Sequence, residues 1–249
     1  MPECDPGGNG EVPGAGGRRR VTLYGVELIR LADEEEVASF VADELVAAAR
    51  AGSSIVLTGG ESPGRAYELA AKREPDWSEA TLWWGDERAV PPDDERSNYR
   101  LADERLIRAL AAHPTPIRIR GELGAQAAAD EYDRFLEGVR LDLVLLGIGP
   151  DGHAASLFPN QPTLDERTRR AIPAEAKLEP FVDRVTMTLP VLCSAPDVLF
   201  LVTGKSKAEA VARAFGQPPS PETPSSLIRS AEGRTRVVAD AAAAARLSD

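Results

Sequence analysis

One histidine follows the most apolar run of the chain and lies in a glycine-rich segment. Residues 142–159 read DLVLLGIGPDGHAASLFP, which places His153 two residues after Asp151. Imidazole has an ordinary pKa of about 6.5, so a histidine presented at a strand end can act as a general base at neutral pH. The second histidine, His113, precedes Pro114 at a predicted helix end and is interpreted as a cap. Asp151 and His153 therefore predict proton-transfer chemistry.

The glycines of this segment have the G-x-G-x-x-G spacing that is typical of dinucleotide binding. Such a site also needs an unbroken helix next and then a strand that ends in an acidic residue. Pro159 and Pro162 would stop a helix after about two turns. The next predicted strand, RVTMTLP, ends without a carboxylate. The segment therefore favours a turn that presents the histidine over a nicotinamide site.

Three further glycine-containing loops lie at the carboxyl ends of predicted strands: TGGESP at 58–63, GDER at 85–88 and TGKSK at 203–207. Adjacent glycines before a helix expose backbone N–H groups to an anion. Lys205 and Lys207 lie in the first turn of a predicted helix, where the helix dipole disfavours cations unless an anion binds there. Taken alone, the charged residues of GDER are more typical of a solvated surface cluster. Parallel strands would bring all four loops to one edge of a sheet.

The elements that must position these loops alternate between short apolar runs and longer segments of helical periodicity. This pattern predicts the α/β class, with an open, mostly parallel, doubly wound (Rossmann-like) sheet and helices on both faces. Gly52 is predicted to end the first helix, and Ser62 and Pro63 to begin the second. The predicted strands cover 21–30, 54–58, 80–88, 115–122, 142–147, 184–190, 197–203 and 235–240. The predicted helices cover 33–51, 62–73, 97–112 and 124–139, with one more after each of the last two strands.

Composition limits the class of protein. The 249 residues are 43% hydrophobic, which is enough to fill a core, and we expect one domain over 21–249 after a disordered Gly/Pro-rich tail over 1–20. A formal net charge of −11 disfavours DNA, RNA and anionic membranes as partners. Apolar runs fall short of the roughly 20 residues of a membrane helix. Cys4 and Cys193 form neither a disulfide framework nor a metal-ligand spacing, which suits the cytoplasm.

Four motifs together resemble the bacterial 6-phosphogluconolactonases, over about residues 25–240. They are LTGGESP, WWGDERAVPPDDERSNYRLA, LLGIGPDGHAASLFP and FLVTGKSKAEAV, in the order expected for that family. The resemblance implies a deaminase-type sheet and hydrolysis of 6-phospho-D-glucono-1,5-lactone to 6-phosphogluconate in the oxidative pentose phosphate pathway. It implies a phosphosugar lactone as the ligand, with no cofactor and no metal. We expect a monomer or a weak homodimer.

The resemblance also implies roles for individual residues. His153 matches the base that deprotonates the attacking water, and Asp151 matches the aspartate beside it, which either orients His153 or contacts a sugar hydroxyl. Arg88 is a second cation, either for the phosphate or for the developing oxyanion. The phosphate cradle comprises Gly59, Gly60, Gly204, Lys205 and Lys207. Weaker candidates for lining the pocket are Ser62, Asn98 and Arg100.

Two alternatives remain open at this point. Glucosamine-6-phosphate deaminases share several of these loops, but they carry a glutamate five residues after the histidine, where this chain has Phe158, and a tyrosine in place of Arg88. A non-catalytic sugar-phosphate sensor would usually carry an N-terminal helix-turn-helix. Only about 20 Gly/Pro-rich residues precede the first predicted strand, which leaves no room for one. The resemblance favours the lactonase over both.

Overall fold

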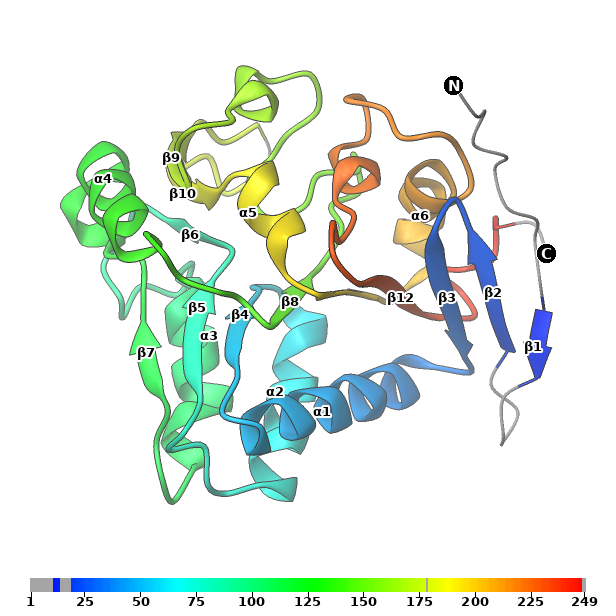
Figure 1. The fold of residues 1–249 in the computed structure, drawn as a ribbon, viewed down its shortest axis with the longest axis horizontal. Coiled ribbons are helices and arrows are strands. Elements are labelled where there is room, and N and C mark those ends of the chain that lie inside the picture. The colour runs from blue at the N-terminus through cyan, green and yellow to red at the C-terminus, as the bar shows by residue number, and fades with distance from the viewer. Residues whose placement is uncertain (1–10, 14–18, 178, 248–249) are drawn as a thin grey trace.

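The computed structural model describes residues 11–13, 19–177 and 179–247, and its largest element is a nine-stranded sheet (Figure 1). Seven neighbouring strands of this sheet are parallel, whereas the two strands at one edge, β1 and β2, pair antiparallel. The order is β1 (Glu11–Pro13), β2 (Arg19–Leu23), β3 (Val26–Leu31), β12 (Arg234–Asp240), β11 (Asp197–Val202), β8 (Leu143–Leu146), β4 (Ser54–Leu57), β5 (Thr81–Trp84) and β7 (Thr115–Ile117).

Helices cover both sides of this sheet, with α1 and α2 on one side and α5 and α6 on the other (Figure 1). The α-helices are α1 (Glu34–Arg50), α2 (Glu61–Arg73), α3 (Asn98–Arg105), α4 (Ala125–Phe135), α5 (Leu189–Ser194) and α6 (Ala208–Phe215). Short 3-10 helices cover Ile107–Ala109, Gly121–Leu123, Pro162–Asp165, Lys205–Lys207 and Pro224–Leu227. The predicted fold class, a mostly parallel α/β sheet with helices on both faces, is confirmed.

Helix α1 illustrates how local sequence produces these elements. The Asp33 carboxylate caps the helix by accepting a hydrogen bond from the Glu36 N–H at 2.9 Å. Val37, Val41 and Leu45 recur every four residues, so they share one face, and all three are fully buried. Gly52, with φ of +66°, ends the helix as predicted, because a left-handed residue cannot continue it.

A second, antiparallel sheet of three strands lies beside the large one. Its order is β6 (Asp86–Arg88), β10 (Arg184–Met187) and β9 (Ala171–Ala174). The chain crosses between the sheets at Gly85, whose N–H donates to the Leu57 carbonyl and whose carbonyl accepts from the Met187 N–H. The single strand predicted over 80–88 is therefore wrong, because its two halves pair in different sheets.

The strand order changes direction between β4 and β8. From β4 the chain moves outward to β5 and β7, whereas from β8 it moves the other way to β11 and β12. The carboxyl ends of the adjacent strands β5, β4, β8 and β11 carry the four glycine-containing loops. Ligands of open α/β sheets bind in the crevice at such a switch point. The prediction that the four loops gather at one edge is confirmed.

Several predicted boundaries differ from the structure. Within the predicted tail, the described residues 11–13 and 19–20 form strands, and the remainder of 1–20 lies outside the described residues. The strand predicted over 21–30 is a hairpin, because Tyr24 and Gly25 adopt positive φ and turn the chain. Turns rather than a helix follow β12. Among the described residues, no helix is both long and apolar enough to cross a membrane.

Candidate active site

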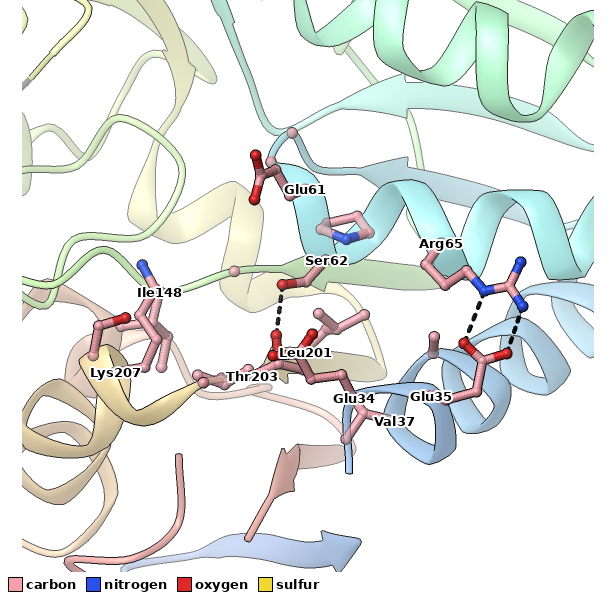
Figure 2. Close-up of a pocket in the computed structure, with 18 residues that line it drawn as sticks. Glu34, Glu35, Val37, Glu61, Ser62, Arg65, Ile148, Leu201, Thr203 and Lys207 are labelled. Carbon is pink, nitrogen blue, oxygen red and sulfur yellow. Dashed lines mark hydrogen bonds and ion pairs between the residues drawn. The ribbon is translucent and has the colours of Figure 1, made fainter. Parts of the chain in front are cut away.

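Two adjoining cavities open at the switch point. One, of about 530 Å³, is lined by His153 and is called the histidine cavity below. The other, of about 500 Å³, extends between the N-terminal ends of α1 and α2 and is called the α1–α2 cavity (Figure 2). The residues that line both cavities mark their junction and come from the ends of β4, β8 and β11: Gly59, Gly60, Gly147, Ile148 and Lys207.

Asp151 and His153 form a hydrogen-bonded pair. Asp151 Oδ1 lies 2.6 Å from His153 Nδ1 and also accepts the His153 backbone N–H at 3.1 Å. A carboxylate on Nδ1 favours the tautomer protonated there, which leaves Nε2 to accept a proton. Partial burial raises the pKa of Asp151, but the hydrogen bonds and charge of His153 outweigh it and hold this pKa below the usual range. Asp151 therefore remains a carboxylate that orients the imidazole.

The glycines before His153 are required by the tight turn that presents it. The Gly149 N–H donates to the His153 carbonyl at 2.9 Å, which closes the turn. A Cβ built on Gly149 would overlap the His153 ring, so only glycine allows this close approach. Gly152 has φ of +94°, a conformation that side chains disfavour. The apparent dinucleotide spacing is thus explained by the turn that carries the histidine.

Replacing Gly149 with alanine tests this close approach. The added methyl group must displace the His153 imidazole and the Asp151 carboxylate, so we expect kcat to fall about tenfold, since small misplacements of reacting groups are costly. Steady-state kinetics of the purified variant measure the effect. The matched control is Gly64→Ala, because a Cβ on this helical glycine makes only ordinary contacts, the nearest at 3.4 Å, and Gly64 lines neither cavity of the described structure. Equal kcat values for Gly149→Ala and the unchanged protein would show that the turn tolerates a side chain.

The junction of the cavities has the features of an anion site. Helix α2 begins after Gly60 with no side-chain cap in the described structure, so its first N–H groups remain for a ligand. Lys207 lies beside this helix end and is half-buried. Burial lowers the pKa of Lys207, and the charge of Asp151 partly opposes that shift. A phosphate at the junction would meet both the helix dipole and an ammonium group.

Ser62 and Gly204 line only the α1–α2 cavity, and both have protein partners. The Ser62 hydroxyl lies 2.7 Å from the Thr203 hydroxyl (Figure 2), and it occupies the second position of α2 rather than the predicted N-cap, which is Gly60. The Gly204 N–H donates to the Asp240 carboxylate at 3.0 Å. The amide predicted to bind phosphate at Gly204 is therefore already used.

Three predicted site residues line neither cavity: Asp151, Lys205 and Arg100. Asp151 still belongs to the site through its hydrogen bond to His153, whereas Lys205 and Arg100 have no such link to it among the described residues. Lys205 is exposed, because it and Lys207 point in different directions from the 3-10 turn that they share. Arg100 lies on the outer face of α3, where it forms an ion pair with Glu104 at 2.8 Å. Both predictions required a side-chain direction that spacing along the chain does not provide.

Asp86 and Glu87 are buried, which corrects the interpretation of GDER as a solvated surface cluster. Glu87 accepts hydrogen bonds from the backbone N–H groups of Asn98 and Tyr99, at 2.7 and 2.8 Å. Burial raises the pKa of Glu87, and these hydrogen bonds oppose the shift. The predicted residue Asn98 lines the histidine cavity and donates through Nδ2 to the Asp86 carboxylate at 3.0 Å. This network fixes the floor of the histidine cavity.

Two arginines supply cations to the histidine cavity. The predicted residue Arg88 lines it, and its Nε is buried without a hydrogen-bond partner among the described residues. Arg184, at the start of β10, also lines it and is 3% exposed. Burial lowers the pKa of Arg184, with Asp86 opposing the shift. Sequence reasoning missed Arg184 and Asp86, because the small sheet that places them there was not predicted.

Comparisons with known proteins identify the family of this chain. The family model described as glucosamine-6-phosphate isomerases/6-phosphogluconolactonase matches residues 32–237. A Mycobacterium leprae protein named 6-phosphogluconolactonase is 37% identical over 194 residues, covering 71% of this chain and 78% of that protein. Its Streptomyces coelicolor namesake is 33% identical over 248 residues, covering 89% and 94%. A solved structure named devB protein is 31% identical, with a TM-score of 0.79 and coverage of 89% and 100%. This chain therefore belongs to the family of glucosamine-6-phosphate isomerases and 6-phosphogluconolactonases.

Proposed function

We propose that this protein hydrolyses 6-phospho-D-glucono-1,5-lactone to 6-phosphogluconate, in the oxidative pentose phosphate pathway. The observation that carries the proposal is one crevice with an oriented histidine in one cavity and an anion site at its junction with the next. Two relatives more than 30% identical to the chain are named for this activity. A phosphorylated lactone offers both an anion to bind and an ester carbonyl to attack.

The phosphate is assigned to the junction and the sugar ring to the histidine cavity. Lys207 and the N–H groups that follow Gly59 and Gly60 supply positive charge at the junction. The protein as a whole has a net charge of −11, so a local cluster of cations is needed to attract an anionic substrate. From the junction, the lactone carbonyl reaches toward His153, which lines the histidine cavity.

His153 acts first as a base and then as an acid. Its Nε2 removes a proton from water, and the resulting hydroxide oxygen forms a bond to lactone carbon C1. The C=O electron pair moves onto oxygen, which gives a tetrahedral oxyanion. As the oxyanion collapses, the bond from C1 to the ring oxygen breaks, and the imidazolium returns its proton to that oxygen. The product carboxylic acid then loses a proton to solvent, so His153 ends the cycle in its starting form.

Arg88 and Arg184 are assigned to the sugar side of the crevice rather than to the phosphate. Both line the histidine cavity and neither lines the α1–α2 cavity. A fixed guanidinium near C1 stabilises the charge that develops on the carbonyl oxygen, at no cost of reorganisation during the reaction. A hydrogen bond from Arg88 Nη1 to the Arg96 carbonyl holds this guanidinium beside the cavity.

We also propose where this enzyme acts, and that it acts without a cofactor. The lactone ester already opens slowly in water, so one positioned base worth roughly 10²–10⁴-fold is sufficient and no cofactor is required. We propose a cytoplasmic enzyme, acting as a monomer or a weak homodimer, that does not bind nucleic acid. The low cysteine content and the net charge of −11 support that assignment.

A coupled assay tests the proposed reaction. Freshly prepared lactone is supplied with 6-phosphogluconate dehydrogenase and NADP, and NADPH formation is followed above the spontaneous rate. We expect a rate proportional to enzyme concentration. Ammonia release from glucosamine 6-phosphate is measured in parallel, because the family includes isomerases of that substrate. Ammonia release without lactone hydrolysis would assign the crevice to an amino sugar instead.

A further inference from the structure

Phe158 contacts two side chains that line the histidine cavity, the imidazole of His153 and the guanidinium of Arg184. Its ring centroid lies 4.8 Å from that of His153, with an interplanar angle of 45°. The guanidinium carbon of Arg184 lies 5.5 Å from the same Phe158 ring, within cation–π range. Phe158 is 1% exposed, so this ring is part of the core and not of the cavity surface.

The chain reverses sharply between His153 and Phe158, which brings the two rings together. The Leu157 N–H donates to the Ala154 carbonyl at 3.0 Å, and Ala155 adopts the left-handed region with φ of +50°. Ser156, at the centre of the turn, is anchored by a hydrogen bond from its hydroxyl to the Asp86 carboxylate. The turn is therefore held by its own backbone hydrogen bond and by the hydrogen bond of Ser156 to Asp86, and together they fix the position of Phe158.

One hydrogen bond to Asp151 does not by itself lock the imidazole. Asp151 holds one ring atom, Nδ1, and rotation about the His153 Cβ–Cγ bond would break this hydrogen bond and turn Nε2 away. A second contact on the flat ring is needed to fix the direction of Nε2, which must face the attacking water. Phe158 supplies that contact from a buried position.

We propose that Phe158 is a positioning residue, which fixes the plane of the His153 imidazole and holds Arg184 against the same ring. This inference rests on the proposed function, because it concerns the base of that reaction. It gives a physical role to the position at which related deaminases carry a glutamate. An aromatic ring there packs on the histidine without adding a second carboxylate beside it.

The test combines spectroscopy with kinetics on Phe158→Leu, which keeps the site apolar and removes the flat ring. The chain has two histidines, so ¹⁵N spectra of the imidazoles are simple, and His153→Gln assigns the His153 signals. We expect a single Nδ1–H tautomer for His153 in the unchanged protein. We expect tautomer averaging in Phe158→Leu, because the ring can then rotate about Cβ–Cγ and leave its hydrogen bond to Asp151. We expect kcat to fall about tenfold with KM within about twofold, as for a reacting group that is bound but misoriented.

Phe215→Leu is a matched control. Phe215 is also fully buried, with the guanidinium carbon of Arg229 at 5.3 Å and the Phe200 ring at 5.2 Å, but it lines neither cavity. It should lose as much thermal stability as Phe158→Leu while keeping kcat and the His153 tautomer.

Three outcomes distinguish the proposals. A single tautomer and unchanged kcat in Phe158→Leu would overturn the positioning role, as would equal losses of kcat in both leucine variants. An unchanged protein without lactonase activity would overturn the proposed function. The tautomer measurement would still test the contact between Phe158 and His153 in that case.

Discussion

Replacing His153 with alanine is expected to lower kcat for the lactone by about 10³-fold, within the range for loss of a general base. This corresponds to about 4 kcal/mol of lost transition-state stabilisation. KM should change little, because the substitution leaves intact the proposed phosphate site, formed by Lys207 and the α2 N-terminus at the junction of the cavities. The measurement is the coupled assay at saturating lactone, with the spontaneous rate subtracted at each concentration.

His113→Ala is the matched control for this substitution. His113 is exposed, and it lines neither cavity in the described structure, so its removal should leave kcat and KM unchanged. If His153→Ala kept kcat within a few-fold of the unchanged protein, the base would have to be another group. The hydrogen-bonded pair with Asp151 would then be structural.

Replacing Lys207 with alanine is expected to lower kcat/KM by about 10²-fold, mainly through KM. Loss of one half-buried charge partner of a phosphate costs roughly 2–5 kcal/mol in binding, and about 1.4 kcal/mol corresponds to tenfold. Calorimetric titration with 6-phosphogluconate measures the same loss without catalysis. An unchanged KM and an unchanged affinity for the product would remove Lys207 from the phosphate site.

Lys205→Ala separates this effect from a general loss of positive charge. Lys205 lies two residues before Lys207, carries the same charge and is exposed outside both cavities. The KM of the Lys205→Ala variant should therefore remain within about twofold of that of the unchanged protein. Equal effects of the two substitutions would mean that long-range attraction, rather than contact at the junction, binds the phosphate. Higher ionic strength would then weaken binding by the same factor in both variants.

The pH dependence of product binding offers a second view of Lys207. Burial lowers the pKa of this lysine, so it loses its proton at a lower pH than an exposed lysine, for which about 10.4 is usual. Affinity for 6-phosphogluconate should therefore decline before that pH is reached as pH rises. The decline should be absent in Lys207→Ala, whose remaining affinity comes from the helix N-terminus.

Much of the fold could be predicted from local patterns. Strands such as β8 are short apolar runs buried on both faces, and helices such as α1 have a cap, a periodic apolar face and a terminating glycine. These features depend on residues within a few positions of one another. The antiparallel small sheet was missed for the opposite reason. Strand β10 lies within the strand predicted over 184–190, but its partner β6 is almost 100 residues away and was joined to the preceding strand in the prediction.

Burial was the property of the site that local sequence described least well. Asp86 and Glu87 resemble a surface cluster in the sequence, yet both are buried, because partners from distant segments satisfy their carboxylates. Lys205 and Lys207 are equivalent in the sequence, but one side chain points to solvent and the other to the junction. Such differences depend on side-chain direction and on the elements packed around each residue.

By itself, the sequence determined the α/β class and the four loops at strand ends, since these depend on periodicity and short spacing. The structure showed that Asp151 is hydrogen-bonded to His153, a choice that spacing had left open. Only the tertiary structure decided which cations reach the crevice. It added Arg184 and excluded Arg100 and Lys205, because a side chain joins a site through the direction in which its element presents it. It also placed Phe158 against His153, a contact that needs the turn between them to close.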